Sequence, residues 1–312
     1  MRTVFLGTPA FAVPTLERMA AAGHEVLLAV TQPDRPRGRG HALAPPPVKE
    51  TALRLGIEVY QPERVRRPEA VERLRALAPE AMVVVGYGQI IPQSVIDIPP
   101  LGIINVHASL LPKYRGAGPV QWAIAKGETR TGVTTMRIDA GLDTGEMLLR
   151  RETEIGAEEN AVELAARLAR MGADLLIETL AGLAAGAIVP EKQDNAQATY
   201  APLLKKEDGV IDWSRAAQAI HNQVRGLQPW PGAFTQFRGE PLHIWRSRPH
   251  PASGAAEVAG TIASVKPLMV RCGTGFLELL EVQSEGRKRV SAADFANGRH
   301  IAENESIGVP SI

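Results

Sequence analysis

The stretch that most constrains the fold of this chain is the apolar hexapeptide GIINVH at residues 102–107. Isoleucine and valine at this density suit a buried strand, and Gly102 marks its start. Asn105 and His107 then share one face at the carboxyl end of the strand, because they are two residues apart. In open α/β sheets the carboxyl ends of strands border the ligand crevice. The pattern therefore predicts a carboxamide and an imidazole that point at a substrate position.

Two loops follow this strand. Pro112 in the first loop, SLLPKYRG, restricts the preceding residue to extended geometry, and two glycines stop any helix before Pro119 can begin one. The second loop, DAGLDTG at residues 139–145, comes after a further predicted strand at residues 132–138. Its glycines flank Asp143 and allow a tight turn. We expect this turn to return a carboxylate to the same crevice.

Asn105, His107 and Asp143 together suit acyl transfer to an amine. In that reaction a neutral amine attacks a carbonyl, negative charge grows on oxygen, and a proton leaves nitrogen. An imidazole beside a carboxylate can accept and release a proton near neutral pH, and a carboxamide N–H can stabilise the oxyanion. Taken singly, His107 would more simply be a hydrogen-bonded core histidine and Asn105 a turn residue. The combination favours catalysis.

The sequence of this region, NVHASLLPKYRGAGP followed by GLDTGEM, resembles the signature of the folate-dependent formyltransferases. The resemblance continues through MRTVFLGTPAFAVPTLERM, TQPDRPRGRGHALAPPPVK, MVVVGYGQIIP and QPWPGAF, and so covers nearly the whole chain. It implies that Asn105, His107 and Asp143 are catalytic. It also implies a folate pocket lined by Tyr87, Gly88, Gln89, Ile90, Ser109, Leu110, Leu111 and Pro112.

The resemblance implies an activity as well. A formyl group would pass from the co-substrate 10-formyltetrahydrofolate to the α-amino group of methionyl initiator tRNA, for translation initiation. A sibling enzyme acting on an amino sugar nucleotide or a purine precursor would use the same trio and folate pocket, but the basic insertion and the C-terminal barrel described below argue against it. A non-catalytic nucleic-acid or nucleotide-binding protein is the more distant alternative, which folate turnover would exclude.

The N-terminal residues predict a βαβ unit, with strands at 3–6 and 26–31 and a helix at 11–22. The first turn reads GTPAFA instead of GxGxxG, and neither GxxxxGKS nor GxxxxGKT occurs, so a dinucleotide or nucleoside-triphosphate site is weakly supported. The run AMVVV at residues 81–85 predicts a central parallel strand. Gly86 and Gly88 beside Tyr87 would let the main chain approach a flat pterin, although an ordinary turn is the alternative.

Residues 32–49, QPDRPRGRGHALAPPPVK, form a basic proline-rich insertion. Five prolines and two glycines predict that no regular element forms there, and four basic residues against the single acid Asp34 give a net charge of 4 − 1 = +3. Composition alone also fits a solvated flexible loop. In the resembled family this insertion holds the tRNA acceptor end. That implies a tRNA-binding role for Arg35, Arg37, Arg39 and Lys49.

Two positions in the insertion bear directly on this implied contact. Arg39 matches the arginine that is credited with it in the family. Ala42 stands where the family often has a second basic residue, which leaves the strength of one phosphate contact open.

The remaining pattern predicts two domains. A leucine-rich helix at 160–185 would close a catalytic domain at residues 1–189, followed by a linker at 190–205 and a C-terminal domain at 206–312. In the C-terminal domain a helix at 213–225, capped by Ser214, precedes the short strand-like runs AFTQF, LHIWR, GTIASV, LMVRC and FLELLEV. The pattern predicts an α/β fold with a Rossmann-like first domain and a mostly parallel sheet, followed by a small OB-like β-barrel domain. The resemblance implies that the first is a formyltransferase domain and that the barrel binds tRNA.

Composition narrows the class of protein further. The hydrophobic fraction is 45% and the charged fraction 22%, as in ordinary globular proteins. The single cysteine, Cys272, rules out an internal disulfide framework, and no Cys/His cluster has metal-ligand spacing, so we expect no metal. No apolar run reaches the roughly 18 residues of a membrane span, and the chain enters a strand too early for a targeting segment. We expect a cytoplasmic monomer without a membrane partner.

The net charge of +1, from 35 Lys and Arg against 34 Asp and Glu, gives no general affinity for nucleic acid, so such binding must rest on local patches. From residue 206 onward, twelve Lys and Arg accompany eleven Asp and Glu. Arg246, Arg248 and residues 287–289 could form a face that tracks phosphates. An evenly charged solvated surface is the alternative.

Overall fold

The computed structural model describes residues 1–37, 42–255 and 258–308. By its internal contacts the chain divides into two compact units. The first comprises Met1–Gly116, Arg130–Glu154 and Ala165–Ala201, and the second comprises Ala117–Thr129, Ile155–Leu164 and Pro202–Ile312. Each unit is built from segments that are distant in sequence. The contiguous domain boundaries at residues 189 and 205 therefore stay a prediction.

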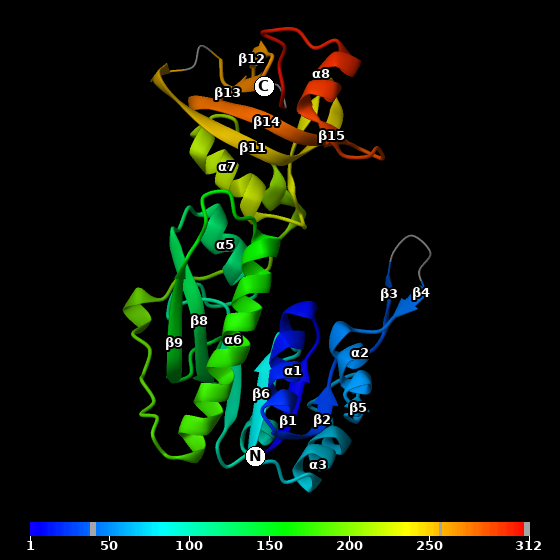
Figure 1. The fold of residues 1–312 in the computed structure, drawn as a ribbon, viewed down its shortest axis with the longest axis vertical. Helices are drawn as coiled ribbons and strands as arrows, with labels where there is room; N and C mark the ends of the chain where they lie inside the picture. The colour runs from blue at the N-terminus through cyan, green and yellow to red at the C-terminus, as the bar shows by residue number, and fades with distance from the viewer. Residues whose placement is uncertain (38–41, 256–257, 309–312) are drawn as a thin grey trace. The chain divides into compact units, whose positions relative to one another are not determined.

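A seven-stranded sheet organises the first unit (Figure 1). Its strands in spatial order are β5 (Val59–Tyr60), β2 (Glu25–Val30), β1 (Arg2–Gly7), β6 (Ala81–Val85), β7 (Ile103–His107), β8 (Arg130–Arg137) and β9 (Met147–Glu154). All neighbours from β5 to β7 pair in parallel, and β8 and β9 are antiparallel to their neighbours. This confirms the predicted mostly parallel sheet.

Helices of this unit bury both faces of the sheet. The elements are η1 (Ala10–Ala12), α1 (Val13–Ala21), α2 (Pro47–Arg54), α3 (Pro68–Ala76), α4 (Gln93–Ile96), α6 (Ala161–Ala184, of which the part from Ala165 belongs to this unit) and η2 (Asn195–Gln197). On one face, side chains of β1, β2 and β6 form a core with Leu74 of α3 and Val95 of α4. On the other face α6 approaches so closely that a Cβ on its Gly172 would lie 2.6 Å from Cγ1 of Val106.

The basic insertion contains more regular structure than its prolines suggest. Strands β3 (Arg35–Arg37) and β4 (Ala42–Ala44) form an antiparallel pair, so the prediction that no regular element forms there is wrong. Pro36 is tolerated because both strands are edges, where a missing N–H breaks no ladder on the outer side. Pro47 occupies the start of α2, where a proline costs no intrahelical hydrogen bond. Arg39 lies outside the described residues.

The second unit contains a six-stranded antiparallel sheet with accompanying helices. Its elements are α5 (Pro119–Ala125), η3 (Lys206–Gly209), α7 (Ala217–Gly226), β10 (Ala233–Phe237), β11 (Glu240–Ala255), β12 (Ile262–Val265), β13 (Leu268–Arg271), β14 (Thr274–Ser284), β15 (Val290–Ser291) and α8 (Ala292–Arg299). The strand order is β10-β11-β14-β13-β12, with β15 paired to β14. Two of the predicted short strands thus belong to the long strands β11 and β14.

The last described residues join the two edges of this sheet. Ile262 donates its N–H to the carbonyl of Glu305, and Ile307 donates to Gly260, at the β12 edge. Gly308 donates to the carbonyl of Gln236 in β10 at the opposite edge, over 2.7 Å. One segment therefore satisfies main-chain groups of both edge strands, which gives the sheet the barrel-like closure predicted for this domain.

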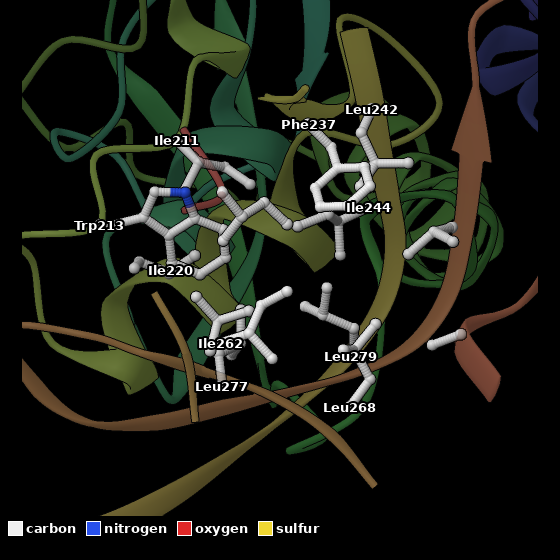
Figure 2. Close-up of a cluster of buried hydrophobic side chains, with 14 of the residues drawn as sticks. Ile211, Trp213, Ile220, Phe237, Leu242, Ile244, Ile262, Leu268, Leu277 and Leu279 are labelled. Atoms are coloured by element: carbon white, nitrogen blue, oxygen red, sulfur yellow. The ribbon is translucent and has the colours of Figure 1, made fainter. Parts of the chain in front are cut away.

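A cluster of buried hydrophobic side chains forms the core against which the strands and helices of this unit pack (Figure 2). Ile220 of α7 and Ile244, Leu277 and Leu279 of β11 and β14 are among its members, each at most 2% exposed. Cys272 belongs to the same core, and burial raises the pKa of its thiol to about 12. Cys272 is therefore a packed core residue and not a reactive thiol.

The helix before the barrel begins later than the sequence predicts. α7 starts at Ala217 instead of Trp213, and Ser214 does not cap it. The hydroxyl and the N–H of Ser214 both bind the carboxylate of Asp212, which turns the chain. The Trp213 side chain instead enters the core, where its indole N–H donates to Thr235 Oγ1 over 3.1 Å.

Across the described part of the chain, none of the helices combines the length and the apolar character needed to cross a membrane.

The closing segment should contribute measurably to the stability of the second unit. Ile307 is 1% exposed, so we expect Ile307→Ala to lower the free energy of unfolding by about 2 to 5 kcal/mol. Val258→Ala, at a side chain that is 60% exposed, should change it by less than about 0.5 kcal/mol. All four tryptophans lie in the second unit, so tryptophan fluorescence during urea unfolding reports on this unit. Equal midpoints for the two variants would contradict the closure.

Candidate active site

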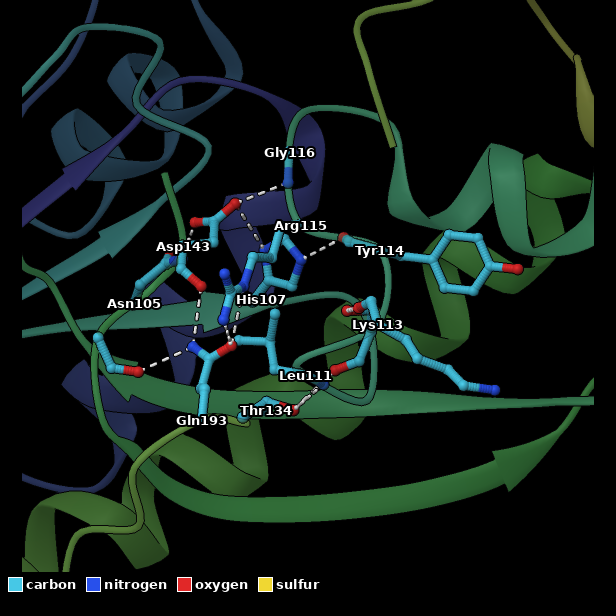
Figure 3. A network of polar contacts seen from close by, with 12 residues as sticks. Asn105, His107, Leu111, Lys113, Tyr114, Arg115, Gly116, Thr134, Asp143 and Gln193 are labelled. Atoms are coloured by element: carbon cyan, nitrogen blue, oxygen red, sulfur yellow. Dashed lines mark hydrogen bonds and ion pairs between the residues drawn. The ribbon is translucent and has the colours of Figure 1, made fainter. Parts of the chain in front are cut away.

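The structure brings the three predicted catalytic side chains together (Figure 3). Asn105 and His107 come from the end of β7, and Asp143 comes from the loop between β8 and β9. The Asp143 carboxylate lies 3.5 Å from Asn105 Nδ2 through one oxygen and 3.7 Å from His107 Nδ1 through the other. Asn105 and His107 are 8% and 6% exposed, and the Asp143 side chain is 15% exposed. The trio is therefore compact and largely shielded from water.

The imidazole of His107 has a defined orientation. Its Nε2 lies 2.9 Å from the carbonyl oxygen of Tyr114. A carbonyl only accepts hydrogen bonds, so Nε2 carries a hydrogen and donates it. The other ring nitrogen, Nδ1, therefore faces Asp143. The partner of His107 is supplied by the loop that follows its own strand.

The loop that carries Asp143 is held by several polar contacts. Gly116 donates its N–H to Asp143 Oδ2 over 2.8 Å. Within the loop, Asp139 accepts hydrogen bonds from the Thr144 hydroxyl and the Gly141 N–H. Asp143 itself has a φ of +51°, in the left-handed region that non-glycine residues rarely adopt. Such a conformation carries a steric cost, smaller for aspartate than for most residues with a Cβ, and the contacts of the loop hold the turn in it.

The chemistry of this trio follows from its geometry. A carboxamide nitrogen and a ring nitrogen each lie within 4 Å of the same carboxylate, so a small substrate group beside that carboxylate could contact all three side chains. The Asn105–Asp143 contact is long, which leaves the carboxamide able to donate to a developing oxyanion. Among the described residues, no three His, Cys, Asp or Glu side chains gather where they could hold a metal ion. The groups are those of proton transfer and oxyanion stabilisation.

The predicted folate-binding loop at residues 109–112 is fixed to the sheet beside the trio. Thr134 of β8 donates its hydroxyl to the Ser109 carbonyl over 2.7 Å and accepts the N–H of Leu111 over 3.1 Å. The Ser109 hydroxyl donates to the carbonyl of Lys113, and the Leu111 side chain packs in a small buried cluster. Leu110 and Pro112 are the half-exposed members of the loop.

Of the predicted pocket residues 87–90, two are buried or hydrogen-bonded within the protein and two are exposed. Tyr87 is 2% exposed in the core, burial raises the pKa of its hydroxyl, and its carbonyl accepts from Thr8 and Gln32. The Gln89 side chain binds the main chain at residues 62–65. Gly88 is exposed with a φ of +85°, and the Ile90 side chain is 92% exposed. Only the last two therefore present free surface, and the folate role of all four stays a prediction.

The predicted tRNA-binding residues have different surroundings. Arg35 is exposed on β3, whereas Arg39 and the side chain of Arg37 lie outside what the structure describes. The Lys49 ammonium lies 2.7 Å from the Asp34 carboxylate, and Gln61 donates to the same carboxylate over 2.7 Å. Hydrogen bonds from Gln61 and Lys49 lower the pKa of Asp34. The Lys49–Asp34 ion pair thus joins the two ends of the insertion. Summing the charges of the insertion does not reveal this pair.

Some basic residues of the second unit also have partners within the protein. Arg248 pairs with Glu278 over 3.3 Å, and the Arg289 guanidinium stacks on the Trp245 ring at 3.6 Å. Two cavities of this unit, of about 770 and 530 Å³, include Arg287 and Arg289 respectively in their walls and none of the catalytic trio. The trio is therefore recognised by its chemistry and not by cavity volume.

Sequence reasoning missed two residues beside the trio. Arg115 is 2% exposed, and its guanidinium donates to the carboxamide of Gln193. Gln193 lies in the predicted linker and in turn binds main-chain carbonyls of the Asp143 loop. A separation of 78 positions between Arg115 and Gln193 leaves no local pattern from which this contact could be predicted.

Comparison with known proteins places the chain in a family. Residues 1–180 match the formyl transferase family, and residues 203–300 match the formyl transferase C-terminal domain. A methionyl-tRNA formyltransferase of Solibacter usitatus (strain Ellin6076) is 72% identical over 308 residues, which cover 99% of this chain and 99% of that protein.

Solved structures share the fold at low sequence identity. A sugar 3N-formyl transferase, whose crystal structure was determined in the presence of dTDP and 5-N-formyl-THF, has a TM-score of 0.65 and 17% identity, over 92% of this chain and 99% of that one. The methionyl-tRNA formyltransferase of Clostridium thermocellum has a TM-score of 0.56 and 16% identity, over 90% and 99%. Fold, domain content and full-length identity agree, and the chain belongs to the formyl transferase family, in the branch of the methionyl-tRNA formyltransferases.

Proposed function

We propose that this protein transfers the formyl group of 10-formyltetrahydrofolate to the α-amino group of methionyl initiator tRNA, which prepares that tRNA for translation initiation. The observation that carries the proposal is the contact of His107 Nδ1 and Asn105 Nδ2 with the Asp143 carboxylate, in a chain whose full-length relatives are methionyl-tRNA formyltransferases. These groups match the needs of acyl transfer to an amine, which include an oxyanion donor and a path for one proton.

The reaction proceeds by direct attack. The neutral methionyl amine forms a bond to the formyl carbon, and the carbonyl oxygen becomes negatively charged. Asn105 Nδ2 and the protonated Nδ1 of His107 donate hydrogen bonds to this oxygen. The Asp143 carboxylate stabilises the imidazolium and accepts the proton that leaves the amine. That proton then passes, directly or through water, to the folate nitrogen as its bond to the formyl carbon breaks.

The binding roles form a second part of the proposal. The folate co-substrate lies against Gly88, Ile90 and the loop at residues 109–112, next to the trio. The tRNA acceptor end lies against the basic insertion, where Arg35 is exposed and Arg39 follows in the chain. The barrel of the second unit extends the tRNA contact, because phosphate contacts spread over a large surface dominate the affinity for nucleic acid.

The assembly and location of the protein are also proposed. We infer a cytoplasmic monomer. The lone Cys272 is 0% exposed, which suits a reducing compartment because it needs no disulfide partner. Light scattering on the purified protein would test the monomer, and a mass of two or more chains would refute it.

An acceptor panel tests the activity itself. Met-tRNA, free methionine, glycinamide ribonucleotide and a nucleotide-linked amino sugar are each incubated with 10-formyltetrahydrofolate. Formylation of Met-tRNA alone is the expected result. Formylation of the amino sugar or of the ribonucleotide in its place would show a sibling activity on the same trio, and absence of turnover with every acceptor would indicate a binding protein.

Substitution of the trio should affect catalysis far more than binding. We expect Asp143→Asn and His107→Ala each to lower kcat about 10²- to 10⁴-fold, the usual range for a lost acid or base, with nearly unchanged folate affinity. Asn105→Ala should cost roughly 3 kcal/mol of transition-state stabilisation. Glu152→Gln, at an exposed carboxylate paired with Arg130, serves as the charge-matched control. A near-normal kcat for Asp143→Asn would refute the proton path.

Substitution of Arg39 tests the basic insertion. Arg39→Ala should lower kcat/KM for Met-tRNA at least about tenfold, equivalent to about 1.4 kcal/mol, because one phosphate contact is lost. Arg39→Lys should restore only part of this loss, since an ammonium lacks the planar fork of a guanidinium. The KM for the folate should stay constant in both variants. Wild-type kinetics for Arg39→Ala would leave the insertion without a role in tRNA binding.

A further inference from the structure

The segment that follows α6 contacts the candidate active site. Thr199 accepts the N–H of Arg115 through its carbonyl over 2.8 Å, and its hydroxyl accepts the N–H of Tyr114 over 2.9 Å. Ala201 donates its N–H to the carbonyl of Arg115 over 2.7 Å. These bonds hold the segment beside the loop that contacts both His107 and Asp143. Residues 193–201 are therefore part of the first unit and not a free connection between domains.

Gln193 of this segment binds the loop that carries Asp143 (Figure 3). Its Nε2 donates to the carbonyl of Asp143 over 2.8 Å and to the carbonyl of Gly145 over 2.8 Å. Both main-chain groups of the turn are thus held by one carboxamide. A Cβ on Gly145 would collide with the carbonyl of Arg137, so the turn is already pressed against β8 on its other side.

Arg115 orients this carboxamide. Its Nε and Nη2 donate to Gln193 Oε1 over 3.0 and 2.8 Å, and Nη2 also donates to Asn195 Oδ1 over 2.8 Å. A guanidinium only donates and a carbonyl only accepts, so the amide oxygen must face Arg115 and the amide nitrogen must face the loop. The direction of the Gln193 carboxamide is therefore determined by its partners.

We propose that Gln193 is a positioning residue, which holds the Asp143 loop in its catalytic conformation while Arg115 keeps the Gln193 carboxamide oriented. The inference deepens the proposed function, and it rests on the catalytic role of Asp143 given there. The left-handed φ of Asp143 is costly for a residue with a side chain, so the turn relaxes when its anchors are lost. A displacement of about 1 Å in a reacting group can reduce catalysis about 10²-fold.

Gln193→Glu removes the two hydrogen bonds to the loop and keeps those from Arg115. A glutamate has the same size and still accepts from Arg115, yet its carboxylate cannot donate to the two loop carbonyls and repels them. We expect kcat to fall about ten- to hundredfold, with the KM for both substrates within about threefold of the wild type. Gln193→Met removes the bonds with Arg115 as well as those with the loop, so its kcat should fall by at least the same factor. A residue of purely structural importance would not produce this split between kcat and KM.

Gln197→Glu is the matched control. Gln197 lies four residues further along the same segment, is exposed, and donates to the exposed Asp194 carboxylate. The change of charge is identical, but it is made away from the catalytic loop. Its kcat and KM should stay at the wild-type values.

Hydrogen exchange gives a readout that does not depend on activity. Peptides that cover residues 139–146 should exchange faster in Gln193→Glu than in Gln197→Glu, while peptides from α6 should exchange equally in the two variants. Faster exchange throughout the first unit, together with raised KM values, would overturn the proposal in favour of a general structural role. Unchanged exchange of the loop would overturn it as well.

The two proposals can fail separately. A wild-type protein that formylates Met-tRNA while Gln193→Glu keeps the full kcat would refute the positioning role alone. A wild-type protein that formylates none of the acceptors would refute the proposed function, and the exchange of the 139–146 loop would then still decide whether Gln193 holds it.

Discussion

The burial of β6 and β7 on both faces of the sheet is the constraint on which the rest of the first unit depends. Every residue of these two strands is buried, so the strands have no solvent face that could turn polar side chains away from the interior. Polar groups are tolerated in such strands where they have partners or where the strand ends. Asn105 and His107 occur at the end of β7, and each has its polar partner in a loop. The site is a direct consequence of this packing.

Much of the fold and of the trio could be predicted from the sequence, because the relevant patterns are local. An apolar run such as AMVVV that ends at a glycine is typical of a central strand, and within a strand an asparagine and a histidine two positions apart share a face. Turns rich in glycine set the positions of the loops. The resemblance to a known family then added the roles of these residues, which the patterns alone do not supply.

The contacts that the sequence did not reveal join residues that are far apart along the chain. Gln193 binds a loop 50 positions before it, and the closing segment of the barrel bonds to residues 42 to 72 positions away. Lys49 and Asp34 are closer, but their pairing depends on Gln61 and on the way the insertion folds at its base. In each case a polar or apolar group finds a partner through tertiary packing, and neither periodicity nor composition records that choice.

The hydrogen bond from His107 Nε2 to the Tyr114 carbonyl has a consequence for how the imidazole can work. Many histidines act as relays that take a proton at one nitrogen and release it from the other. Here Nε2 is bonded to a main-chain carbonyl, so Nδ1 is the nitrogen left to face a substrate. In the proposed mechanism Nδ1 donates to the oxyanion while the Asp143 carboxylate carries the amine proton. That mechanism requires the formyl oxygen, the attacking amine and the leaving nitrogen to lie at one edge of the ring, so the two substrates have to approach this edge together.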